Sequence, residues 1–158
     1  MVRLADLPES DRDNMLKKVP ALPAFPGRPW ATGPALAARR VAIVTTAGLH
    51  VRGDRPFGGG AAGMDYRVIP GDAAAADLVM SHSSVNFDRS GFQQDWNVAF
   101  PLDRLKELVR DGMVGAVAGF HYSFMAAVSP VTNYEPKARE LAGLLKRDGV
   151  DAVLLSPV

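Results

Sequence analysis

The sequence contains no cysteine in its 158 residues. This absence excludes disulfide bonds, thiolate chemistry and cysteine-ligated metals within these residues. It also lacks an excess of charge of either sign, because 18 lysines and arginines face 17 aspartates and glutamates, for a formal net charge of +1. The charges are interspersed, so neither nucleic acid nor an anionic membrane is expected as a partner.

Long apolar runs are absent as well, and none approaches the ~20 residues that a membrane-spanning helix needs. The N-terminal region carries Asp6, Pro8 and Glu9 where a signal peptide would be apolar. We therefore expect a cytoplasmic location. Hydrophobic residues make up 47% of the chain, which suits one domain with a buried core.

Residues 1–39 differ in composition from the rest and are predicted to form a helix and an arm. The helix is expected over residues 8–18, with acidic residues in its first turn. Five prolines between residues 19 and 36 exclude a helix or a central strand there, so this segment is predicted to be extended. We expect Phe25 and Trp30 to be held on the domain surface, because burying aromatic rings is strongly stabilising.

Residues 40–158 are predicted to form an α/β domain. Short apolar runs indicate strands over 40–44, 66–69, 77–81, 114–118 and 150–155, and amphipathic spacing indicates helices over 101–110 and 136–146. The glycine-rich residues 48–65 and the polar residues 81–99 are predicted to be loops. Strands that alternate with helices favour a mostly parallel sheet of the Rossmann-like, doubly wound kind.

Each of the three histidines follows a predicted strand: His50, His82 and His121. Because the carboxyl ends of parallel strands meet at one edge of a sheet, we expect the histidines to converge there. Their long spacing, without an H-x-H or H-x-x-x-H pair, argues against a metal site. Hydrogen bonding or proton transfer near neutral pH is the favoured role. The alternative is that they are loop histidines bonded to the backbone.

Polar residues in the same predicted loops are candidate ligands for a small substrate. A guanidinium suits a carboxylate, and hydroxyl and amide groups suit either a carboxylate or an amine. The candidates are Thr45, Thr46, Arg55, Ser83, Asn86, Tyr122 and Ser123. The alternative is that the serines and Asn86 stabilise their own turns and that Arg55 is a solvated surface residue. Neither a phosphate-binding glycine motif nor a G-x-S-x-G motif is present.

Several segments together resemble one family. They are Val41–His50, Tyr66–Pro70, Asn97–Leu105, His121–Met125 and Asp148–Leu155. These segments are similar to the selenoprotein B family of the glycine/sarcosine/betaine reductases, which has D-proline reductase as a relative. The likeness extends over about residues 40–158 and is greatest to the short, stand-alone type.

The resemblance implies a reductase that uses a selenol or thiol on a small amine, amino acid or related substrate, with a thiol or protein electron donor. In the family, a strand ending in Leu-Leu-x-Pro precedes a selenocysteine or cysteine, and here the sequence ends at Val158. We therefore expect an N-terminal fragment without the nucleophile, produced by reading a selenocysteine codon as stop. An in-frame UGA at that codon would support this expectation.

The resemblance also implies roles for the histidines. His50, His82 and His121 would surround the missing nucleophile, lower its pKa or protonate a leaving amine. No cofactor is expected within the chain itself. Two other functions remain open: a non-catalytic domain that binds a small carboxylate or amine, and a metal-dependent hydrolase that uses the histidines.

Overall fold

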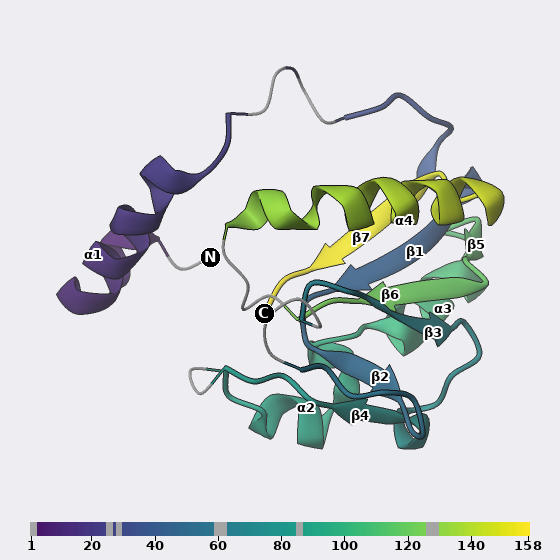
Figure 1. Cartoon of the computed structure of the whole chain (residues 1–158). Helices are drawn as coiled ribbons and strands as arrows, with labels where there is room; N and C mark the ends of the chain where they lie inside the picture. The colour runs from purple at the N-terminus through teal and green to yellow at the C-terminus, as the bar shows by residue number, and fades with distance from the viewer. Residues whose placement is uncertain (1–2, 25–26, 28–29, 59–62, 85–86, 126–129) are drawn as a thin grey trace.

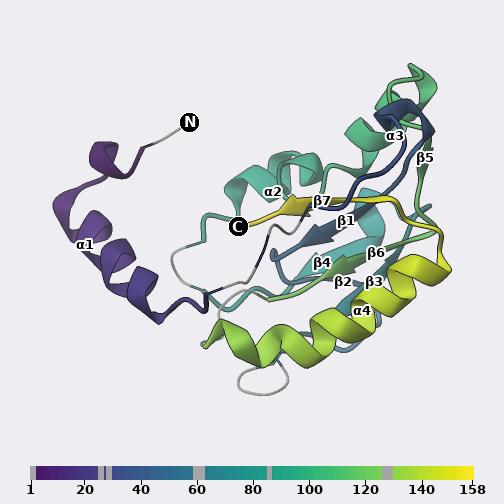
Figure 2. The same ribbon diagram turned by 90° about the horizontal axis from the view of Figure 1, so that it is seen from above.

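The computed structural model describes residues 3–24, 27, 30–58, 63–84, 87–125 and 130–158. It shows an α/β protein in which a five-stranded sheet separates two sets of elements. Helix α4 (Glu135–Arg147) covers one face of the sheet. Helix α3 (Leu102–Arg110), helix α2 (Ser90–Gln94) and a two-stranded ribbon lie on the other side (Figures 1 and 2). The α/β class is thus confirmed.

Strand β1 (Arg40–Thr45) is the centre of the sheet. Two short strands, β5 (Ala116–Val117) and β6 (Phe120–Ser123), pair with it in parallel along one side. Strand β7 (Ala152–Ser156) pairs with it in parallel along the other side. Strand β3 (Arg67–Pro70) pairs antiparallel with β6, so the sheet is mixed. The mostly parallel, doubly wound arrangement is not confirmed.

The remaining two strands, β2 (Leu49–Val51) and β4 (Leu78–Met80), form a separate antiparallel pair. Two predictions are corrected here, because β2 lies inside the predicted loop 48–65 and β4 is not in the main sheet. The cause is Gly48, whose φ of +66° turns the chain immediately after β1 and sends it into the ribbon. A three-residue strand is too short to show an alternating pattern.

Three predicted helices are confirmed: α1 (Glu9–Lys18), α3 and α4. Helix α3 buries Leu102 and Leu105 and has Asp103 in its first turn, where a carboxylate is favoured. Helix α2 lies in the segment predicted to be a loop, and its five residues are too few for a recognisable stripe. Short 3-10 helices occur at Leu4–Asp6, Val19–Ala21, Leu36–Ala38, Ala75–Asp77, Trp96–Val98 and Val131–Tyr134.

The N-terminal segment stands away from the sheet in both ribbon views. Helix α1 has no buried residue. The prediction that burial holds Trp30 on the domain surface is wrong, since its side chain is 88% exposed, and Phe25 lies outside the described residues. Helix α1 offers only Met15 and Leu16 as apolar contacts, which is too little to anchor the segment. The division into residues 1–39 and 40–158 remains a prediction.

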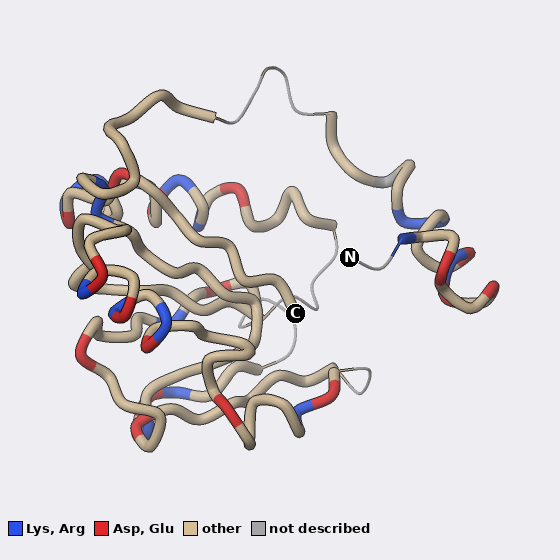
Figure 3. The backbone as a smooth tube through the Cα atoms, turned by 180° about the vertical axis from the view of Figure 1, so that it is seen from behind, with Lys and Arg blue, Asp and Glu red and all other residues tan. Residues whose placement is uncertain are grey.

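Charged residues gather on the helices and turns and leave the strands of the sheet largely free (Figure 3). The core is apolar on both sides of β1. Val41 and Ile43 pack toward α3 and the ribbon, and Val44 packs with Tyr122 and Leu141 of α4. In the described part of the chain, no helix has both the length and the apolar character that crossing a bilayer requires.

His121 completes the hydrogen bonding of β1. The ladder on this side is interrupted between β5 and β6, and there the Ile43 N–H donates to Nδ1 of His121 over 2.9 Å. His121 is fully buried, and this burial lowers its pKa to about 4. The imidazole is therefore neutral near pH 7, as an acceptor at Nδ1 must be.

This placement corrects the prediction that His121 lies in a loop after a strand over 114–118. Strand β5 covers only two residues, and the segment predicted as a loop forms β6. Strand β6 was not predicted because its polar residues interrupt the apolar pattern that indicates a buried strand. His121 and Ser123 are buried because their side chains accept backbone N–H groups, those of Ile43 and Leu49.

We predict that His121→Leu lowers the free energy of unfolding by about 1–3 kcal/mol at pH 7, because the buried Ile43 N–H loses its acceptor. The variant should also lose part of the acid sensitivity of the wild type. The neutral form of His121 is favoured in the folded state, so its contribution is complete above pH 6.5 and is lost as the pH falls toward 4. Over this pH range, protonation of His121 should remove about 3 kcal/mol from the free energy of unfolding of the wild type.

Urea unfolding of both proteins between pH 7 and pH 4 measures this. The difference in stability between wild type and variant should shrink steadily as the pH falls. Parallel curves for the two proteins across this range would contradict the role assigned to His121.

Candidate functional site

The carboxyl ends of β1, β6 and β7 meet at one edge of the sheet, and the loop after β4 joins them there. The Gly48 N–H donates to the Phe124 carbonyl over 2.9 Å, and the Gly48 carbonyl accepts the Ser81 N–H over 2.9 Å. Ala47 and Met125 form a further bridge. Backbone hydrogen bonds therefore hold three chain segments together where an open α/β sheet ordinarily binds its ligand.

Side-chain hydroxyls link β1 and β7 to a shared acceptor. The hydroxyls of Thr45 and Ser156 both lie within hydrogen-bond distance of the Ala99 carbonyl, at 3.0 and 2.9 Å. Thr45 is fully buried, and its oxygen also accepts the Ala47 N–H over 3.2 Å. Thr45, a predicted substrate ligand, is thus placed within the scaffold of this edge.

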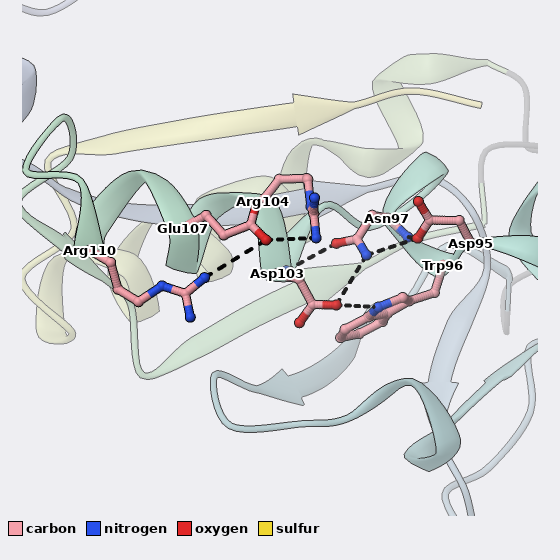
Figure 4. A network of polar contacts seen from close by, with 7 residues as sticks. All are labelled: Asp95, Trp96, Asn97, Asp103, Arg104, Glu107 and Arg110. Atoms are coloured by element: carbon pink, nitrogen blue, oxygen red, sulfur yellow. Dashed lines mark hydrogen bonds and ion pairs between the residues drawn. The ribbon is translucent and has the colours of Figure 1, made fainter.

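A polar network joins Trp96 and Asn97, which precede Ala99 in the chain, to Asp103 of α3 (Figure 4). Asp103 accepts hydrogen bonds from the Trp96 indole over 2.7 Å and from the Asn97 amide over 3.1 Å. The Asn97 side chain in turn accepts the Asp103 N–H over 3.0 Å. Hydrogen bonds from Asn97 also lower the pKa of Asp95. Asp103, in the first turn of α3, therefore makes structural contacts with the segment that precedes the helix.

The same view shows a second, exposed part of α3. Glu107 lies between Arg104 and Arg110, with closest approaches of 2.8 and 3.8 Å. These are exposed ion pairs and contribute little to stability. The contacts of Asp103 with buried Trp96 and with Asn97 are less exposed and connect α3 to the segment before it.

The structure does not bring the three histidines together as predicted. His121 lies within β6, and His50 lies within β2, where its Nδ1 is 3.1 Å from the Val51 carbonyl. Of the three, His82 alone occupies a loop at the carboxyl edge. Among the described residues, no three histidine, aspartate or glutamate side chains form a group that could hold a metal ion.

His82 is buried behind Gly48 and faces the ring of Phe87. Its Nδ1 accepts the Ser84 N–H over 3.1 Å, which places the ring proton on Nε2. That Nε2 is buried and has no hydrogen-bond partner among the described residues, as is also true of His50 and His121. Burial, and then the charge of Arg89, lower the pKa of His82, so it is a neutral N–H donor near pH 7.

Two further predicted ligands lie at this edge. Ser83 is exposed, with its hydroxyl 3.3 Å from the sulfur of Met125. Thr46 is half-buried, and its hydroxyl accepts the Val158 N–H over 3.0 Å. These two hydroxyls lie at the edge, and His82 occupies the loop beside it.

Other predicted ligands lie elsewhere. Tyr122 is buried on β6 against Tyr66, and burial raises its pKa. Ser123 accepts the Leu49 N–H over 2.8 Å within the core. Arg55 is exposed in the segment between β2 and β3, where its carbonyl accepts from the Arg67 guanidinium over 2.7 Å. Asn86 lies outside the described residues.

Sequence reasoning missed Gly48, Met125 and Tyr134. The Tyr134 hydroxyl donates to the Met125 carbonyl over 2.7 Å and fixes the chain after β6. A Cβ on Gly48 would lie 2.9 Å from both the backbone nitrogen and the Cα of His82. A glycine directly after a buried strand was the available signal for such a close approach.

We therefore predict that Gly48→Ala displaces His82 and costs more stability than Gly53→Ala. Both glycines have positive φ, +66° and +92°, so both variants carry a backbone penalty of about 1–2 kcal/mol. A Cβ at Gly53 meets nothing within 4 Å, so only Gly48→Ala adds a clash with backbone. Denaturant unfolding of both variants compares the costs, and equal losses would refute the close packing of Gly48 on His82.

Comparison with known proteins identifies relatives of the chain. Residues 34–158 match the family described as glycine/sarcosine/betaine reductase selenoprotein B (GRDB). D-proline reductase subunit gamma of Acetoanaerobium sticklandii is 38% identical over 117 residues, which are 73% of this chain and 47% of that protein. Sarcosine reductase complex component B subunit beta of Peptoclostridium acidaminophilum is 31% identical over 121 residues, 74% of this chain and 27% of that protein.

Glycine reductase complex component B subunit gamma of Carboxydothermus hydrogenoformans is 27% identical over 149 residues, which are 91% of this chain and 34% of that protein. The chain thus spans half or less of the length of these relatives. No solved structure matches it. The family match includes all the strands found in the described residues, and it confirms the resemblance seen in the sequence. The chain belongs to the glycine/sarcosine/betaine reductase selenoprotein B family.

Proposed function

We propose that the chain is part of a selenol- or thiol-dependent reductase that acts on a small amine, an amino acid or a related substrate. The observation that carries this proposal is the family match over residues 34–158. The names of the relatives connect such chains with reductases of D-proline, sarcosine, glycine and betaine. We also propose that a thiol or a protein donates the electrons. The proposed location is cytoplasmic.

The reactive selenol or thiol comes from polypeptide other than these 158 residues, because they include no cysteine. A selenolate or thiolate is the reactive form of such a group, and hydrogen-bond donors or positive charge stabilise it. In this proposal the chain supplies the edge of the sheet on which that group is placed. The proposed location is beside the loop after β4, next to Gly48.

His82 is the histidine best suited to a direct role. Its neutral ring carries a proton on Nε2, and that atom has no partner among the described residues. We assign it the role of hydrogen-bond donor to the chalcogenolate or to the substrate carboxylate. Thr46 and Ser83 are assigned to substrate binding at the same edge. His50 and His121, which lie within strands, are assigned supporting roles in positioning.

The test of the function uses the assembly in which this chain occurs, purified from its source organism through a tag on the chain. We expect reduction of at least one of D-proline, glycine, sarcosine and betaine with a dithiol as electron donor. Because the chain has no cysteine, loss of activity with iodoacetamide would place the reactive group on another polypeptide segment. An assembly that binds these compounds without reducing them would instead support a non-catalytic binding domain.

In the active assembly, His82→Gln should lower the rate by roughly 10²-fold, the usual effect of removing a donor to a developing or fixed negative charge. If the donor stabilises a chalcogenolate, the pH–rate profile should also move to higher pH. Gln93→Ala on the nearby, exposed part of α2 is the control and should leave both unchanged. A His82→Gln variant with wild-type rate and pH profile would leave His82 with a structural role only.

A further inference from the structure

Strand β7 has an apolar edge, beside which Trp30, Ala31 and Arg39 of the N-terminal segment line a pocket. Among the described residues it pairs with β1 alone. Its side chains Val153, Leu154 and Leu155 are 38%, 41% and 69% exposed. The strand contains no charged residue and no proline, the features that normally protect an edge strand from pairing with another chain.

The exposed side chains lie on both faces of the strand. Residues alternate between faces along a strand, so Val153 and Leu155 share one face and Leu154 occupies the other. A strand that is apolar on both faces is typical of the interior of a sheet. Strand β7 therefore has the composition of an interior strand but the position of an edge strand.

A groove continues from this edge beneath α4. It has a volume near 910 Å³, and β7 contributes Val153 and Leu155 to its wall. The opposite wall consists of Leu141, Ala142 and Leu145 of α4, which lies alongside β7 in Figure 2. The groove and the strand edge form one surface because Val153 and Leu155 belong to both.

The polar content of this groove is small. Thr46 and Tyr134 bring its hydroxyl groups, and the Tyr134 hydroxyl already donates to the Met125 carbonyl. The free backbone groups of β7 are the main polar feature beside it. An extended polypeptide would fit both the strand edge and the apolar groove. Its backbone would pair with β7, and its alternate apolar side chains would enter the groove.

The lengths of the relatives indicate which polypeptide would bind at β7 and the groove. The match to D-proline reductase subunit gamma covers 73% of this chain but only 47% of that protein. The relatives thus contain at least as much polypeptide outside the matched region as within it. We propose that β7 and the groove beneath α4 dock an extended, apolar segment equivalent to that additional polypeptide, which joins the sheet as a strand beside β7.

This inference rests on family membership and not on the reductase activity proposed above, and its test measures binding alone. The tagged 158-residue chain is purified from its source organism, and the polypeptides bound to it are sequenced for similarity to the part of Acetoanaerobium sticklandii D-proline reductase subunit gamma that lies outside the aligned 117 residues. Native mass spectrometry of the purified chain should show a 1:1 heterodimer. Hydrogen exchange at the amides of β7 should slow at least tenfold in that complex relative to the chain alone.

A matched pair of variants locates the surface. Leu155→Lys places a charge in the groove and should weaken the heterodimer at least tenfold. Val68→Lys places the same charge on β3, the opposite edge strand, at a side chain that is 40% exposed, and should leave binding unchanged.

Absence of a heterodimer, or equal binding by the two variants, would overturn the proposal. So would a homodimer of the chain alone that Leu155→Lys dissociates and Val68→Lys does not. In that case a second copy, and not the additional polypeptide of the relatives, would occupy this surface.

Discussion

Hydrogen bonding on both sides of β1 is the constraint on which the rest of the structure depends. The strand is nearly inaccessible to solvent from Val41 to Ile43, so an unpaired N–H or carbonyl there would cost about 1–3 kcal/mol. On one side β7 pairs with it continuously from Val41 to Thr45. On the other side the ladder is shared by β5 and β6, and the imidazole of His121 accepts the Ile43 N–H between them.

The candidate site follows from the way β1 ends. Gly48 turns the chain with a positive φ, and its own backbone groups bond the segments after β6 and β4. Because Gly48 lacks a side chain, the backbone of His82 can lie against it. The loop that carries His82 is therefore held at the carboxyl edge of the sheet. Beside it, the Ala99 carbonyl is the shared acceptor for Thr45 of β1 and Ser156 of β7.

Sequence patterns predicted the parts of this fold that depend on local periodicity. Strands β1 and β7 and helices α1, α3 and α4 have clear apolar runs or stripes, and all five were recognised. Strand β4 lies within the strand predicted over 77–81, but β2 and its pairing with β4 were not predicted, because the turn at Gly48 sets that pairing. Strand β6 was read as a loop because His121 and Ser123 are polar, and only their partners across the sheet explain their burial.

The same limit applies to the candidate site. His82 lies in a loop after a strand, as predicted, but that strand is outside the main sheet, and His50 and His121 lie inside strands. Hydroxyl groups predicted to bind a substrate, those of Thr45 and Ser123, are committed to backbone groups that only the folded chain brings near. The resemblance to the selenoprotein B family came from several short segments taken together, and the family match confirms it.

We propose that this chain forms the sheet edge of a chalcogen-dependent reductase, with the reactive atom beside Gly48 and His82. A crystal structure of the active assembly, with anomalous scattering used to locate its reactive selenium or sulfur atom, tests this most directly. We expect the atom to lie at the carboxyl ends of β1 and β6, within hydrogen-bond reach of Nε2 of His82. A reactive atom at the opposite end of these strands, or on a surface remote from them, would show that this edge is not the reaction site.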